Sequence, residues 1–120
     1  MDIVRIYADA AGESHFEDLE LDLNAFSTVS GLETLTSELW PASSVQFRNV
    51  DGDFTSDFHT APQRQLVVYL TGSNEVEVST GERRAFGPGM VQLVEDTTGR
   101  GHKAAKTNGQ PIQMLFVRLD

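Results

Sequence analysis

Two of the three histidines in this sequence, His59 and His102, lie at the starts of strand-like segments. His59 stands shortly before the apolar run 64–70. An imidazole titrates near neutral pH, so each ring could carry a proton, bind a transition metal or serve as a polar residue at a strand end. The chain has no cysteine, which excludes disulfides, thiolate zinc sites and a cysteine nucleophile. Proton transfer, metal binding and a structural role therefore stay open for both histidines.

The elements that would position these histidines are short strands separated by glycine and proline turns. Apolar and polar residues alternate in several segments, and the run 64–70 is apolar on both faces, as in a central buried strand. The segments with strand patterning are 3–8, 15–23, 44–50, 64–70, 74–79, 90–95, 101–107 and 112–119. This pattern predicts an all-β fold, either a sandwich or a closed barrel.

One segment, 30–41, differs from this pattern. It places Leu32, Leu35, Leu39 and Trp40 near helical spacing, and Pro41 ends it. We expect a short helix or an ordered loop there.

Composition limits the class of protein and its partners. A chain of 120 residues is typical of one domain. Its net charge of −9 disfavours nucleic acid and anionic lipid as partners. No apolar stretch approaches the roughly 20 residues that a membrane helix needs. The N-terminus lacks the basic start and apolar centre of a signal peptide, so we expect a cytoplasmic protein.

Residues 43–119 resemble the cupin superfamily, whose members are small β-barrels of the jelly-roll type. The family's first motif is Gly, five residues, His-x-His, three or four residues, Glu, six residues, Gly. His59 takes the place of the first histidine, and Ala61 stands where the second would be. Gln65 stands at the glutamate position, and six residues then lead to Gly72.

The family's second motif is Gly, five residues, Pro-x-Gly, two residues, His, three residues, Asn. Here Gly89 is followed by five residues, and Glu95 replaces the proline. Thr97 replaces the glycine. The histidine arrives two positions late, at His102, and Lys106 then takes the asparagine position. The resemblance implies a single cupin-like domain.

The implied domain spans residues 1–120. N-terminal strands and a loop occupy residues 1–42, and a core barrel occupies residues 43–119, with at most one short helix near residues 30–40. The resemblance also predicts a homodimer. The strand 3–8 could add to the sheet of a neighbouring copy.

The resemblance further implies a site for a small organic ligand. Its metal ligands would be His59, Gln65 and His102, where two neutral imidazoles suit divalent zinc, copper, nickel or iron and the glutamine is a weak, uncharged donor. A metal-dependent enzyme, for example of dioxygenase type, is one hypothesis. The second is a metal-free isomerase, lyase or cyclase in which His59 or His102 moves protons and Tyr69 contributes a hydroxyl. The third is a binding or sensing protein without turnover.

Strand alternation predicts which other side chains face the barrel interior. If Gln65 points inward, Val67 and Tyr69 do too. On the last strand, two sets of residues compete for the pocket face, and we favour Met114, Phe116 and Arg118 over Leu115, Val117 and Leu119. Phe47 is a further predicted wall residue.

Overall fold

The structure is a computed structural model that describes all 120 residues, and it consists of strands joined by turns and loops, without a helix. The strands are β1 (Asp2–Ala8), β2 (Ser14–Glu20), β3 (Ala25–Val29), β4 (Leu32–Thr36), β5 (Ala42–Val50), β6 (Phe54–Thr55), β7 (Gln65–Thr71), β8 (Asn74–Val78), β9 (Arg83–Phe86), β10 (Val91–Val94), β11 (His102–Lys106) and β12 (Ile112–Leu119). No helix is present that is long and apolar enough to cross a membrane.

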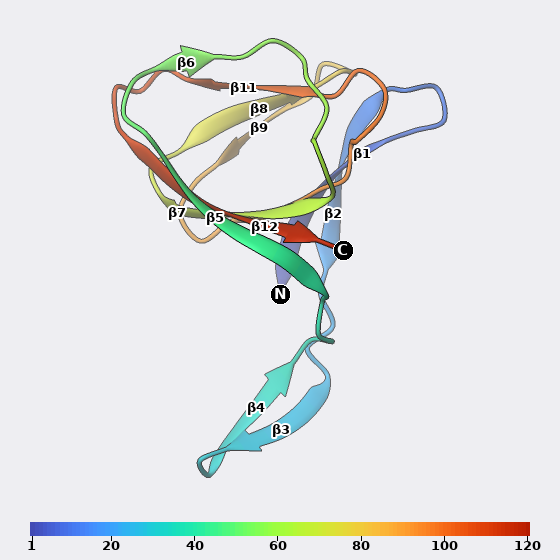
Figure 1. Cartoon of the computed structure of the whole chain (residues 1–120), viewed down its shortest axis with the longest axis vertical. Helices are drawn as coiled ribbons and strands as arrows, with labels where there is room; N and C mark the ends of the chain where they lie inside the picture. The colour runs from blue at the N-terminus through green and yellow to red at the C-terminus, as the bar shows by residue number, and fades with distance from the viewer.

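The strands form two main sheets that face one another, and a separate hairpin (Figure 1). The larger sheet has the order β2-β1-β10-β7-β12-β5, and the smaller sheet has the order β6-β11-β8-β9. Neighbouring strands are antiparallel except β1 and β10, which are parallel. The prediction of an all-β, jelly-roll type fold is confirmed.

The main core fills the space between the two sheets. It includes Ile6, Phe16, Val78, Phe86 and Ile112, all nearly or completely buried. Strand alternation produces this core: in β8, Val76 and Val78 point inward, while their neighbours face solvent. The two-sheet arrangement thus follows from apolar residues placed at every second position.

A second, smaller cluster covers part of the outer face of the larger sheet. Its buried members are Ile3, Leu93 and Leu119, and Trp40 packs against them. This cluster therefore packs side chains of the first strand, β1, and the last strand, β12, together.

Residues 30–41 do not form the predicted helix or ordered loop. β3 and β4 form an antiparallel hairpin in which Val29 pairs with Leu32. Its turn consists of Ser30 and Gly31, with φ angles of 51° and 80°. Two consecutive positive φ angles are typical of the tight turn that matches the twist of a two-stranded hairpin. The helical spacing of the leucines was therefore misleading.

β1 is an interior strand of the larger sheet. It pairs with β2 on one side and with β10 on the other. Both of its edges are therefore occupied, so the predicted route to a homodimer through strand 3–8 is wrong.

Candidate ligand site between the two sheets

A cavity of about 420 Å³ opens between the facing sheets. This lies within the range of about 300–1,000 Å³ that is usual for small-molecule pockets. The larger sheet contributes side chains from β5, β7, β10 and β12, and the smaller sheet contributes side chains from β6, β8 and β11. The apolar part of the lining includes Val67, Val76, Val94, Ala104, Met114 and Phe116.

The last strand presents the predicted face to this pocket. Met114, Phe116 and Arg118 all line it. The prediction for Phe47 is wrong, because its side chain is 75% exposed. Phe47 pairs with Leu115, which is not among the lining residues, and its neighbours Gln46 and Arg48 line the pocket instead.

His59 and His102 come together at this pocket. Each backbone N–H donates to the other residue's carbonyl oxygen, at 2.9 and 3.0 Å. The centroids of the two rings are 4.8 Å apart, with 54° between the ring planes. Both side chains line the pocket, with His59 exposed and His102 largely enclosed. Two residues 43 positions apart in the sequence thus form one imidazole pair.

The hydrogen bonds of the two rings fix which nitrogen carries the hydrogen. His59 Nδ1 lies 2.9 Å from the carbonyl oxygen of Asp57. A carbonyl oxygen only accepts, so Nδ1 is the donor. His102 Nδ1 lies 2.6 Å from Asp96 Oδ2, a carboxylate oxygen that also accepts. In each neutral ring, Nε2 is therefore the basic nitrogen.

Asp96 is a functional candidate that sequence reasoning missed. It follows β10, its side chain is completely buried, and its backbone carbonyl accepts a hydrogen bond from Ala61 N–H. One carboxylate oxygen contacts His102, while Oδ1 has no hydrogen-bond partner. A buried carboxylate behind an imidazole orients the ring and stabilises its protonated form. The only signal in the sequence was an acidic residue six positions before a candidate histidine.

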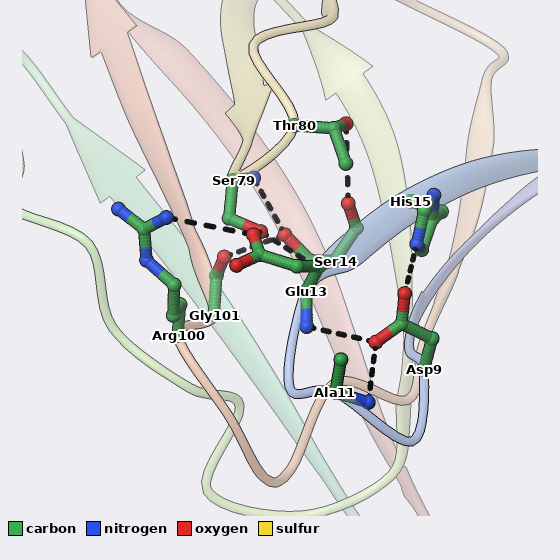
Figure 2. A network of polar contacts seen from close by, with 9 residues as sticks. All are labelled: Asp9, Ala11, Glu13, Ser14, His15, Ser79, Thr80, Arg100 and Gly101. Atoms are coloured by element: carbon green, nitrogen blue, oxygen red, sulfur yellow. Dashed lines mark hydrogen bonds and ion pairs between the residues drawn. The ribbon is translucent and has the colours of Figure 1, made fainter.

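The chain just before His102 is anchored by buried polar contacts (Figure 2). The Ser14 hydroxyl donates to the carbonyl oxygen of Gly101 at 2.7 Å and accepts from Ser79 N–H at 2.7 Å. Ser79 Oγ in turn donates to the Glu13 carboxylate. These contacts join the turn between β1 and β2 to the turn after β8 and to the start of β11.

Tyr69 lies on the pocket wall with its hydroxyl fully engaged. The hydroxyl donates to Asn74 Oδ1 at 2.8 Å and accepts from Gln92 Nε2 at 3.1 Å. Burial raises the pKa of Tyr69 well above its usual value, against the smaller opposing effect of these two hydrogen bonds. The hydroxyl hydrogen is thus committed to Asn74, and it is not free for a ligand unless that bond breaks.

The residues at the family's metal positions lie at one pocket but offer few strong metal ligands. His59 and His102 are paired, and Gln65 lines the same pocket with its side chain nearly buried. However, no group of three or more His, Asp or Glu side chains comes together in a way that could hold a metal ion. Ala61, at the second histidine position, has no donor atom. Two imidazoles and one neutral amide form a weak set for a divalent cation.

The two facing sheets and the cavity between them describe a protein of jelly-roll type. The comparisons agree that the fold is cupin-like. A Cupin 2 conserved barrel domain protein from Salinispora arenicola CNS-205 matches with a TM-score of 0.52 and 23% identity, over 87% of this chain and 88% of that one.

A second solved structure with this fold is the polyketide cyclase RemF from Streptomyces resistomycificus. It matches with a TM-score of 0.53 and 20% identity, over 62% of this chain and 52% of that one. The match thus spans about half of the cyclase. No protein-family model and no curated protein matches the sequence.

Proposed function

We propose that this protein binds a small organic molecule in the pocket and that His102, supported by Asp96, exchanges a proton with it. The observation that carries the proposal is the contact of 2.6 Å between His102 Nδ1 and the buried carboxylate of Asp96. This contact leaves Nε2 as the basic atom of a ring that lines the pocket. When Nε2 accepts a proton, the carboxylate stabilises the resulting charge.

His59 has a different role in this proposal. Its ring lies beside that of His102 but is exposed at the pocket, and its Nδ1 contacts a backbone carbonyl rather than a carboxylate. A neutral carbonyl stabilises an imidazolium less than a carboxylate does. We therefore assign the proton transfer to His102 and ligand contact to His59 and to the Gln65 amide, which makes no hydrogen bond within the protein.

The same geometry favours metal-free proton transfer over the metal-dependent hypothesis. The chain supplies an acid–base pair but no third strong ligand. One structural neighbour is a polyketide cyclase, which supports ketones as the first class of probe. A hydrogen on a carbon next to a carbonyl is acidic enough for a positioned base to remove it.

Hydrogen exchange in a ketone probe tests the proposal without knowledge of the natural substrate. The protein is incubated with 2-tetralone in heavy water, and loss of the proton signals next to the carbonyl is followed by NMR. We expect the wild type to exchange them faster than buffer does. His102→Gln should abolish the acceleration, and Asp96→Asn should reduce it by about 10–10⁴-fold. His15→Gln is the matched control, because His15 pairs with Asp9 outside the pocket.

Three outcomes would contradict the proposal. Acceleration that survives in His102→Gln would place the base elsewhere. Acceleration that is lost with a chelator and restored by one added ion would establish the metal-dependent hypothesis. Binding of the ketone without faster exchange would favour a binding protein without turnover.

A further inference from the structure

Two arginines, Arg48 and Arg118, have no carboxylate partner, although the chain has twice as many acidic as basic residues. The other seven of the nine lysines and arginines each lie within 3.9 Å of a carboxylate oxygen, for example Arg84, at 2.6 Å from Asp18. Arg48 donates only to the neutral amide of Gln46, at 3.0 Å, and Arg118 makes no side-chain hydrogen bond in the protein. Arg48 and Arg118 are thus the two basic side chains that form no ion pair with a carboxylate.

Both unpaired arginines line the pocket, and no aspartate or glutamate does. They lie on neighbouring strands, where Arg118 pairs with Ser44 and Arg48 pairs with Met114. The Arg48 guanidinium stacks 3.9 Å from the centroid of the Phe116 ring. One wall of the pocket is therefore aromatic and cationic, in a protein whose net charge is −9.

We propose that the pocket selects a small anionic ligand, with a planar apolar body beside Phe116 and a carboxylate on the Arg48 guanidinium. Arg118, four positions further along the same pair of strands, adds positive charge to this wall of the pocket. The inference rests on the proposed function, since it assigns the ligand class of the same pocket. A guanidinium offers a planar fork of donors that matches a carboxylate in two parallel hydrogen bonds. The acidic surface would disfavour an anion elsewhere on the molecule, so these arginines provide its binding position.

Two probes that differ only in charge test this inference. The affinities of 2-naphthoate and of the neutral 2-naphthamide are measured by titration calorimetry. We expect the wild type to bind the carboxylate at least about tenfold more tightly, a difference of about 1.4 kcal/mol. Arg48→Gln and Arg118→Gln should each reduce this preference, while Arg83→Gln should not, because Arg83 is a surface arginine paired with Glu77.

The outcomes separate this inference from the proposed function. Equal affinities for the two probes would overturn the anion preference and leave the pocket as a ligand site. Failure of the wild type to bind either probe would count against both. A preference that persists in both pocket-arginine variants would show that other groups, such as the two histidines, hold the anion.

Discussion

Gly101 packs directly against the backbone of His59. An added Cβ on residue 101 would lie 2.0 Å from the His59 carbonyl oxygen, and the φ angle of Gly101 is +76°. That same carbonyl accepts the hydrogen bond from His102 N–H. The pairing of the two histidines therefore depends on the absence of a side chain at position 101.

Gly101→Ala should destabilise the protein and separate the two imidazoles. Gly109→Ala is the matched control, because Gly109 has a similar φ of +71° but open space around its Cβ position. Both variants incur the backbone cost of about 1–2 kcal/mol for a left-handed residue. We expect the Gly101 variant to lose about 1–3 kcal/mol more, through the steric conflict with His59. Denaturant unfolding measures both free energies, and equal losses would contradict the close contact.

Ser14→Ala should weaken the anchor in front of His102. The Ser14 hydroxyl is completely buried and forms hydrogen bonds with both Gly101 and Ser79. Its removal leaves a carbonyl and an N–H without partners, which costs about 1–3 kcal/mol. Ser37→Ala should change stability by less than about 0.5 kcal/mol, because its hydroxyl contacts only the adjacent Glu38. Similar thermal midpoints for the two variants would show that the network is not needed for stability.

Alternation along single strands made much of the pocket predictable. The inward set on β12, Met114, Phe116 and Arg118, follows from the period of two once one member is placed. The same reasoning failed for Phe47, because both faces of an edge strand are open to solvent and apolarity does not mark the inner one. On β5 the polar residues Ser44, Gln46 and Arg48 line the pocket together with Val50. The apolar residues Val45 and Phe47 are exposed instead.

Features that depend on turn geometry or tertiary contact were not predictable. The Ser30-Gly31 pair forms a tight hairpin turn, whereas the leucine spacing had led to the prediction of a short helix or an ordered loop. Asp96 lies in a loop between two strands, and nothing in its neighbours shows that the loop buries it behind His102. Burial of a charged group is a property of the assembled fold rather than of a local pattern.

Tyr69→Phe separates a structural role from a catalytic one. Loss of the hydroxyl leaves Asn74 and Gln92 unpaired in a buried site, so we expect a loss of about 1–3 kcal/mol. Tyr7→Phe, whose hydroxyl makes no hydrogen bond within the protein, should be nearly neutral. Affinity for 2-naphthoate should be unchanged, because the ring remains. A stable variant that no longer accelerates ketone exchange would instead make the hydroxyl part of the catalytic machinery.

The pKa of Tyr69 adds a pH dependence to this comparison. Because burial raises the pKa of the folded tyrosine above its unfolded value, the stability linked to the neutral phenol is fully present below about pH 10 and declines above it. Unfolding free energies measured on either side of this pH should therefore fall more steeply for the wild type than for Tyr69→Phe. Parallel curves for the two proteins would contradict the raised pKa.

Glu95 should contribute to stability at neutral pH and lose that contribution in acid. Burial alone would raise its pKa, but hydrogen bonds from Arg64 and Arg5, each at 2.5 Å, outweigh burial and lower it. A carboxyl with a lowered folded pKa stabilises the fold above its unfolded pKa of about 4.3, and this effect is lost as pH falls through the folded value.

Glu95→Gln should therefore cost about 1 kcal/mol at neutral pH, because two guanidiniums lose a shared carboxylate that is one-fifth exposed. As the pH falls through the lowered pKa of Glu95 in the folded protein, the wild-type carboxyl becomes neutral, and the two proteins should converge. Glu20→Gln is the control, since Glu20 is exposed and forms no ion pair, so its difference from the wild type should be small at every pH. Thermal midpoints measured across this pH range test the prediction. A difference in midpoint between Glu95→Gln and the wild type that stays constant with pH would mean that the carboxylate charge contributes nothing to the arginine contacts.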